Sequence, residues 1–212
     1  MYAHIDRPSS HGQAEGGPGP AGLNSSSTSQ PGLLGAITFR QFAGPAGVRL
    51  TLWDTEADAA AFAGQYAELA ALPGEIYQVV DAAAGPAAKQ APAYARLMYF
   101  DGPRAPEQAA AENLAGQQRI WPAMRGLSGL VGTYVLRGPD LGSVVITLAT
   151  SLEALDATAR AVMSTELMPG EDPALLPGPD RIEIHHVTGY HVPNRLPSSL
   201  PSAAPAASLK GQ

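Results

Sequence analysis

The sequence predicts an α+β protein made of two βαββαβ units that follow one another in the chain. Three observations support this prediction. Short apolar runs with β-branched and aromatic residues are bounded by Gly and Pro, as is typical of strands. Longer Ala-rich runs begin at residues that cap helices. The order of these runs in the first half recurs in the second half, which indicates an internal repeat.

Seven segments have clear strand character, and an eighth at the N-terminus is a further candidate. The seven are Leu33–Phe42, Val48–Trp53, Ile76–Asp81, Tyr94–Phe100, Gly129–Leu136, Val144–Ala149 and Arg181–His191, and the further candidate is Met1–Asp6. Alternate residues of a strand face opposite sides. His185 should therefore share a face with Glu183 and His191, whereas His186 should lie on the other face with Ile184.

Three segments have helix character. Thr55 caps a predicted helix over Thr55–Leu72, and Ser151 caps another over Ser151–Glu166. The third, Pro106–Arg125, begins with Pro-Glu in its first turn. Trp121 precedes a proline, so we expect this helix to kink or end there.

The two halves of the chain match in detail. Gly32–Gly35 resembles Gly129–Gly132, and Val48–Leu52 resembles Val144–Leu148. The element order of the second half is that of a ferredoxin-like unit. We therefore expect a first repeat over residues 1–88 and a second, complete repeat over residues 89–192. Chance similarity of two strand-turn-strand-helix segments is the alternative.

Two segments are too rich in Gly, Pro, Ser and small residues to offset the entropy of ordering. Residues 8–32 are expected to form a flexible loop in place of the first helix of the first repeat, and residues 193–212 a disordered tail.

Composition excludes several classes of protein. The formal net charge of −6 disfavours non-specific nucleic-acid binding. No apolar run approaches the ~20 residues that a membrane span needs, and the N-terminus has no signal-peptide pattern. The absence of cysteine excludes disulfides and thiolate sites. We expect a cytoplasmic protein without nucleic-acid or membrane partners.

The segment Val48-Arg49-Leu50-Thr51-Leu52-Trp53-Asp54-Thr55 resembles the third strand and second helix start of the antibiotic biosynthesis monooxygenase family, the dimeric α/β-barrel proteins. The second half is similar in its Gly129–Gly132 turn and its Arg137–Asp140 hairpin. The resemblance spans about residues 33–192. It implies that two ferredoxin-like units pair their antiparallel sheets into one barrel. A tandem repeat would build that barrel within a monomer; a homodimer of the chain remains an alternative.

The resemblance also implies a function. Several members of the family oxidise phenolic polyketide rings without metal or flavin, in a pocket between helices and sheet. The expected activity is that of a cofactor-independent monooxygenase on a small aromatic or polyketide-like compound, with no cofactor. The alternative is a non-catalytic barrel that binds a small ligand or fills its cavity with its own side chains.

Six residues are candidates for this chemistry. The predicted catalytic residues are His185 as a base and Tyr134 and Arg96 as oxyanion donors, and the predicted substrate-binding residues are Trp53, Trp121 and Asn113. A structural role is the alternative for each. The helix after Trp53 contains no histidine, which argues against haem. The position that matches Trp53 in the second half is Ala149, so the two halves are not expected to be equivalent. His185 and His191 are too far apart along the strand for a metal site.

Overall fold

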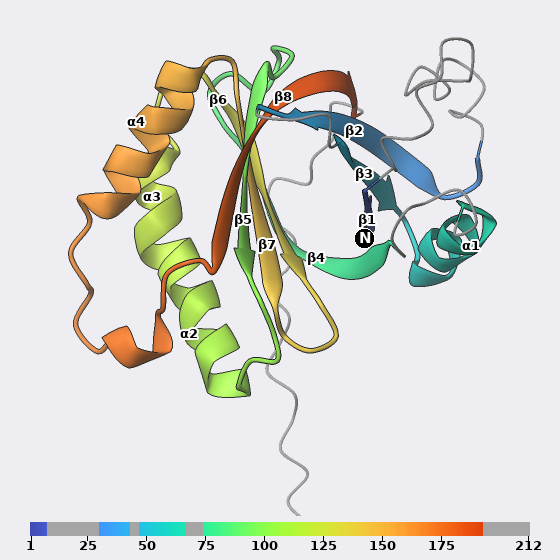
Figure 1. Ribbon diagram of the computed structural model, residues 1–212. Helices are drawn as coiled ribbons and strands as arrows, with labels where there is room; N and C mark the ends of the chain where they lie inside the picture. Colours follow the sequence, from blue (N-terminus) through green and yellow to red (C-terminus); the bar gives the residue numbers. More distant parts are fainter. Residues whose placement is uncertain (8–29, 43–46, 67–73, 193–212) are drawn as a thin grey trace, which may run out of the picture.

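The computed structural model describes residues 1–7, 30–42, 47–66 and 74–192 (Figure 1). Its strands are β1 (Tyr2–Asp6), β2 (Leu33–Gln41), β3 (Gly47–Trp53), β4 (Glu75–Ala84), β5 (Tyr94–Phe100), β6 (Leu130–Arg137), β7 (Ser143–Ala149) and β8 (Arg181–His191). Its helices are α1 (Glu56–Tyr66), α2 (Pro106–Ala115), η4 (Gly116–Ile120), α3 (Trp121–Met124), α4 (Leu152–Met163) and η5 (Pro173–Leu175). All eight predicted strands are present.

The strands form one closed antiparallel barrel in the order β1-β3-β2-β8-β5-β7-β6-β4. Within each half the strands therefore lie side by side as last, first, third and second, which is the order of a ferredoxin-like sheet. Pairing of β2 with β8 and of β4 with β6 closes the barrel. The predicted α+β class and the barrel are confirmed.

The two halves also share strand register. In the first half Leu33 pairs with Trp53, and the register then shifts before Gly35 pairs with Leu52. In the second half Leu130 pairs with Ala149, and an equivalent shift follows. Gly32 and Gly129, which precede these strands, both have positive φ, at 77° and 83°. Glycine adopts this conformation without the steric cost of a Cβ atom.

The main core fills the barrel. Inward side chains from all eight strands, mostly Leu, Ile, Val and Ala, pack there with a few aromatic residues. The outer face of each sheet carries helices: α1 lies on the first half, and α2, α3 and α4 lie along the second (Figure 1). Burial of both faces of a sheet in this way is what makes such a layered domain stable.

One sequence prediction needs correction. Phe39 of β2 pairs with Val187 of β8, and Thr38 of β2 pairs with Gly189. Thr188 is therefore an extra residue in β8. This bulge changes the face of the sheet to which each side chain after Thr188 points. Val187 and Tyr190 both pack against the barrel core. His191 is therefore exposed on the opposite face from His185, and the prediction that they share a face is wrong.

The helix predicted over Pro106–Arg125 is present, and an irregular turn lies directly before Trp121, where we expect a kink or an end. The helix widens into the π-turn η4, in which the Trp121 N–H donates to the carbonyl of Gly116. The wider turn accommodates Pro122, which has no N–H to donate, and the chain stays helical to Met124.

Several predictions lie outside the described residues. These are the flexible loop expected over residues 8–29 in place of the first helix of the first repeat, residues 67–72 of the helix predicted over Thr55–Leu72, and the tail over residues 193–212.

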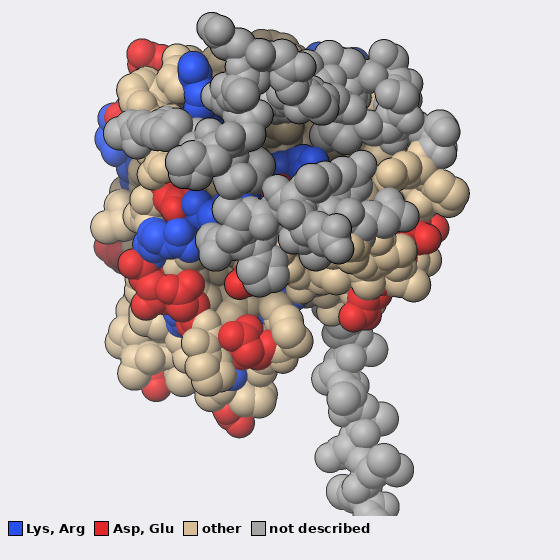
Figure 2. Space-filling model, turned by 45° about the vertical axis from the view of Figure 1, so that its right-hand side comes forward, with Lys and Arg blue, Asp and Glu red and all other residues tan. Residues whose placement is uncertain are grey.

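No helix of the described part is long and apolar enough to cross a membrane. In the described part of the face shown in Figure 2, basic and acidic side chains are interspersed, so it presents no continuous basic surface.

Candidate functional site

Arg96, on the outward face of β5, is a buried cation whose charge has no counter-ion among the described residues. Its side chain lies beneath α4, and the residue is 8% exposed. The guanidinium donates to Thr158 Oγ1 at 3.0 Å and to the Leu155 carbonyl at 3.3 Å, while Nε has no partner. Burial lowers the pKa of Arg96, but arginine stays protonated in proteins. A positive charge is thus held between sheet and helix.

Thr147 lies directly beside Arg96, as its Cα partner on β7. It is 1% exposed, and its hydroxyl has no hydrogen-bond partner among the described residues. Buried polar groups in native proteins nearly always have a partner, and an exception calls for a physical explanation. Arg96 and Thr147 together leave a buried N–H donor and a buried hydroxyl without partners among the described residues, on neighbouring strands.

The next row of the same face is apolar and only partly buried. Met98, Val145 and Val135 follow one another across strands β5, β7 and β6. All three are only partly buried, although they lie in the middle of a sheet. We call Arg96, Met98, Val135, Val145 and Thr147 the outer-face site. It offers an apolar surface that ends at a buried cation, an arrangement that suits an apolar molecule with one anionic group.

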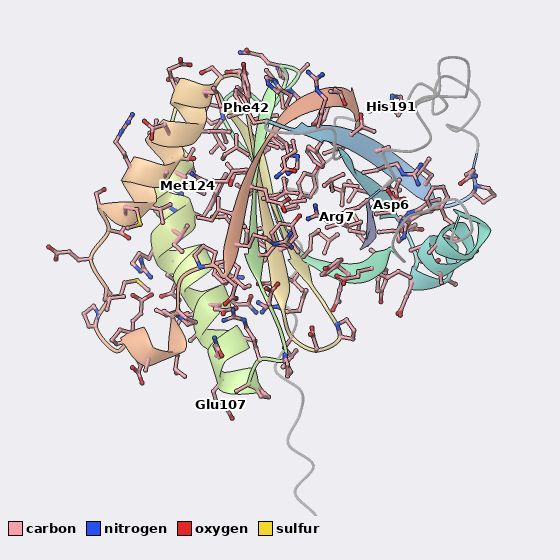
Figure 3. All side chains as sticks on the ribbon, in the orientation of Figure 1. Asp6, Arg7, Phe42, Glu107, Met124 and His191 are labelled. Carbon is pink, nitrogen blue, oxygen red and sulfur yellow. The ribbon has the colours of Figure 1, made fainter. Side chains whose placement is uncertain are left out.

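A second polar cluster surrounds Glu183 inside one end of the barrel. Arg7 donates to both Glu183 oxygens at 3.1 Å and to the Tyr99 hydroxyl at 2.9 Å, and its side chain points into the barrel (Figure 3). Tyr99 donates to Glu183 at 3.2 Å, and Arg181 donates to it at 2.6 Å. His185 Nε2 lies 3.0 Å from the same carboxylate. One carboxylate therefore has four partners.

The directions of the pKa shifts in this cluster agree with an ionised Glu183 beside a neutral His185. Burial lowers the pKa of His185, although Glu183 opposes the shift. Burial raises the pKa of Glu183, but hydrogen bonds from His185 and Arg7 outweigh it, so the pKa is lowered overall. An ionised carboxylate only accepts hydrogen bonds, so neutral His185 carries its proton on Nε2. Its Nδ1 is then an acceptor without a partner among the described residues.

A pocket of about 650 Å³ opens beside this cluster, at the end of the barrel where β1 and β5 end. Arg7, Tyr77, Tyr99 and Arg181 contribute polar groups to its wall. The polar groups of the wall are largely engaged: the Tyr77 hydroxyl donates to Glu75, and both arginines bind Glu183. Both arginines of this pocket are therefore already paired with the Glu183 carboxylate.

The outward face of the first half is closed. His4 and Asp6 are 2% and 3% exposed. Asp6 accepts from Arg49 Nε at 3.0 Å, and the Arg49 guanidinium carbon lies 5.3 Å from the centre of the Phe62 ring. Burial lowers the pKa of His4, and neither of its ring nitrogens has a hydrogen-bond partner among the described residues.

Trp53 packs in the same layer. It is 2% exposed, its ring centre lies 5.0 Å from that of Phe62, and its indole N–H donates to Thr51 Oγ1 at 2.9 Å. Trp53 forms one core cluster with Ala59 and Phe62 of α1.

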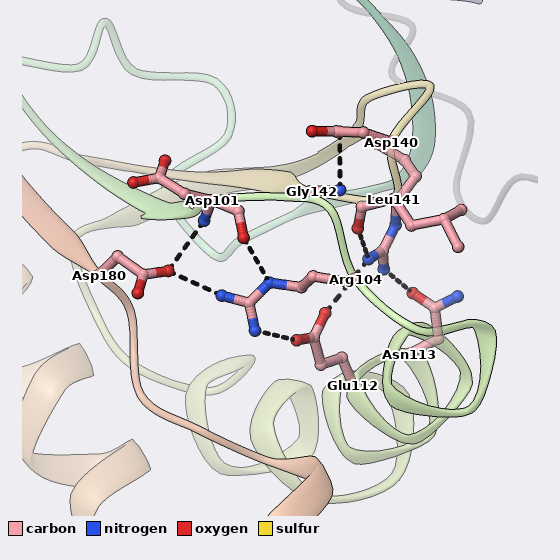
Figure 4. Close-up of polar contacts among 9 residues, drawn as sticks. Asp101, Arg104, Glu112, Asn113, Asp140, Leu141, Gly142 and Asp180 are labelled. Atoms are coloured by element: carbon pink, nitrogen blue, oxygen red, sulfur yellow. Dashed lines mark hydrogen bonds and ion pairs between the residues drawn. The ribbon is translucent and has the colours of Figure 1, made fainter.

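Asn113 belongs to a polar network beside the β6–β7 hairpin (Figure 4). Its side-chain oxygen accepts from Arg137 at 2.8 Å. Glu112 accepts from Arg137 and from Arg104, which also binds Asp180 at 2.7 Å. The mutual pairing of these groups indicates that the network fixes α2 against the sheet.

Comparison with known proteins shows the fold alone. No family model and no curated protein matches the sequence. An anthrone oxidase-like protein superposes with a TM-score of 0.58 at 11% identity, over 94% of this chain and 96% of its own. A ferredoxin-fold protein from Listeria monocytogenes, related to antibiotic biosynthesis monooxygenases, gives 0.54 at 11% identity, covering 89% and 95%. A monooxygenase-like protein from Listeria innocua gives 0.52 at 10% identity, covering 88% and 94%.

The chain has the antibiotic biosynthesis monooxygenase-like fold. At such low identity, the structural relatives cannot transfer a substrate or a catalytic residue to it.

In this fold the six predicted residues lie in different places. Arg96 belongs to the outer-face site, His185 and Tyr134 lie inside the barrel, Trp53 lies beneath α1, and Asn113 and Trp121 lie on the helical segment α2–α3. Tyr134 is fully buried, its hydroxyl has no partner among the described residues, and burial raises its pKa. Trp121 is half-buried.

Sequence reasoning missed Thr147, His4 and Asp6. Thr147 follows Val145 by two residues in an apolar strand, and nothing in the sequence shows that it pairs with Arg96. His4 and Asp6 carry a usable signal, because Tyr2, His4 and Asp6 alternate with the apolar Ala3 and Ile5. No group of three or more acidic or histidine side chains that could hold a metal ion occurs in the described part of the chain.

Proposed function

We propose that the protein binds a small aromatic or polyketide-like compound at the outer-face site and oxidises it with molecular oxygen, without a metal or organic cofactor. The observation that supports this proposal is the buried charge of Arg96, which has no counter-ion among the described residues. A buried charge of this kind is costly unless something pairs with it. A phenolate or enolate oxygen of a substrate would supply that partner.

The chemistry follows from this pairing. Arg96 would favour the ionised form of a phenol or enol, whose proton leaves to water. The resulting carbanion-like ring is electron-rich and can reduce oxygen directly. Addition of O₂ and a proton at a CH₂ carbon gives a hydroperoxide, which loses water to leave a ketone. The protein would supply an apolar surface at Met98 and Val145 and a fixed positive charge where negative charge develops.

The test is oxygen uptake with 1,8-dihydroxyanthrone as the probe. Arg96→Met should lower the enzymatic rate about 100-fold, the usual effect of removing an oxyanion donor. The matched control is Arg160→Met, because Arg160 is exposed on α4 and, among the described residues, forms an ion pair only with Asp156. The proposal is wrong if the wild type gives no rate above the spontaneous oxidation, or if both variants behave alike.

The pocket at the end of the barrel, beside Glu183, supports a second candidate, a non-catalytic ligand-binding role. Its volume of about 650 Å³ suits a small molecule. His185, set behind Glu183, would then act as a hydrogen-bonding partner of that carboxylate. Protection of Tyr77 and Arg181 from chemical labelling by a bound compound, without turnover, would favour this role.

We also propose that the two halves are copies of one ancestral unit, with residues 1–88 and 89–192 as the repeats, and that the chain works as a monomer. The equal strand order and the shared register shifts support the duplication. A single chain already closes the barrel that two chains would otherwise form. Light scattering of the purified protein should give the mass of one chain; twice that mass would point to a homodimer.

A further inference from the structure

We infer that each chain has one ligand site, which lies in the second half and binds a hydroxylated aromatic anion. The equivalent face of the first half is closed by its own side chains. This inference rests on the proposed function and deepens it. It comes from comparing residues that occupy the same register position in the two halves.

Register defines the equivalent positions. His4 pairs with Thr51 in the first half as Arg96 pairs with Thr147 in the second. One step further along the same face, Asp6 pairs with Arg49 as Met98 pairs with Val145. Each outer-face position therefore has a counterpart whose chemistry can be compared.

In the first half Asp6 and Arg49 neutralise one another, whereas the ring nitrogens of His4 have no hydrogen-bond partner among the described residues. Asp6 and Arg49 form an ion pair in which the carboxylate is almost fully buried. The Arg49 guanidinium also lies over Phe62. An apolar ligand would have to displace or desolvate a charged pair, which opposes binding. Met98 and Val145 put a partly buried apolar surface in the same place.

The helices add to the difference. Thr55 and Ser151 each accept a hydrogen bond from the N–H three residues later, at Asp58 and Ala154. This alignment makes Phe62 the counterpart of Thr158. Phe62 packs its ring against His4, with the ring centres 5.7 Å apart. Thr158 instead holds Arg96 by a single hydrogen bond and leaves Nε free.

The free hydroxyl of Thr147 specifies a second ligand group. Its counterpart Thr51 accepts from the Trp53 indole N–H at 2.9 Å. Ala149 stands at the tryptophan position and has no such donor, so Thr147 Oγ1 is left as an acceptor. A ligand hydroxyl can take over the role of the indole N–H.

The indole space itself is not free. Leu155, the counterpart of Ala59, packs on Ala149 there. The ligand body must therefore lie over Met98 and Val145. One anionic oxygen for Arg96, one hydroxyl for Thr147 and an apolar ring system together describe a polyhydroxylated arene.

The experiment measures binding of 1,8-dihydroxyanthrone to the full chain under argon, where oxidation cannot occur. We expect one equivalent per chain. Met98→Asp/Val145→Arg transfers the first-half ion pair to the second half and should weaken binding at least tenfold. The matched control is Ala110→Asp/Leu114→Arg, which places the same two charges on exposed positions of α2 and should leave the affinity unchanged.

Thr147→Val tests the same inference without adding charge, because valine has the shape of threonine. It should weaken binding about three- to tenfold, as expected for the loss of one hydrogen bond. Two equivalents per chain would overturn the inference and leave the proposed function standing. One equivalent that neither substitution weakens would place the ligand outside the outer-face site and overturn both. If the wild type binds no 1,8-dihydroxyanthrone, the proposed function falls and the inference falls with it.

Discussion

Thr147→Val should stabilise the protein in the absence of ligand, whereas Thr51→Val at the equivalent position should destabilise it. The two threonines occupy matching register positions and are each 1% exposed. They differ in their hydrogen bonds. Thr51 accepts from the Trp53 indole, while Thr147 has no partner among the described residues.

The magnitude follows from that difference. An unpartnered buried hydroxyl costs about 1–3 kcal/mol, so replacing it with a methyl group at Thr147 should recover roughly 1–2 kcal/mol. Thr51→Val leaves the buried Trp53 N–H without an acceptor and should cost about 1–3 kcal/mol. For a chain of this size each kcal/mol shifts the melting temperature by about 2–4 °C.

Urea unfolding followed by tryptophan fluorescence measures both effects, with thermal melts as a second readout. The comparison is sharp because the chemical change is identical and only the partner differs. A loss of stability in Thr147→Val similar to that in Thr51→Val would mean that the Thr147 hydroxyl has a partner in solution. The reasoning that assigns it to a ligand would then be refuted.

Three further predictions concern the fold. Gly129→Ala should destabilise the protein strongly, because φ at Gly129 is 83° and an added Cβ atom would lie 2.7 Å from Ala154. Gly170→Ala should cost less stability, because φ is 91° there but no atom of the described residues lies near the added Cβ. Equal losses of unfolding free energy in the two variants would contradict this. Arg49→Met should cost about 3–5 kcal/mol, because it leaves the buried Asp6 carboxylate without its ion-pair partner, and Asp6→Asn added to it should restore most of the loss in a double-mutant cycle. Burial lowers the pKa of His185, so stability should be full above its ordinary value of 6.5 and fall as the pH drops below it. His185→Gln should lessen that slope, and an unchanged slope would show that His185 does not carry it.

Much of the fold could be predicted because its signals are local. The segments Tyr94–Phe100 and Arg181–His191 are bounded by turn residues, and the strands match the predicted ranges. Ser151 caps α4 through a hydrogen bond from the Ala154 N–H, as its residue type suggests. The bulge at Thr188 could not be predicted, because it depends on how β8 pairs with β2 rather than on its own sequence.

The candidate site was harder to predict because it depends on register. Arg96 was a predicted catalytic residue, and the structure places it in the outer-face site. Thr147 lies 51 positions away and meets Arg96 only through the pairing of β5 with β7. The inward orientation of His185 also depends on how β8 pairs with its neighbours. Where both faces of a strand are buried, no pattern in the sequence shows which face meets the helices.

The cost of Arg96 bears on how the site is maintained. Its charge is buried, and its described partners are the neutral groups of Thr158 and Leu155. Replacing a poorly compensated buried charge with an apolar side chain is often neutral or stabilising. If packing alone determined this position, an apolar residue would serve at least as well. The arginine is therefore best explained by a partner that is present only when a ligand is bound, and a folded but inactive Arg96→Met variant is the result that this explanation requires.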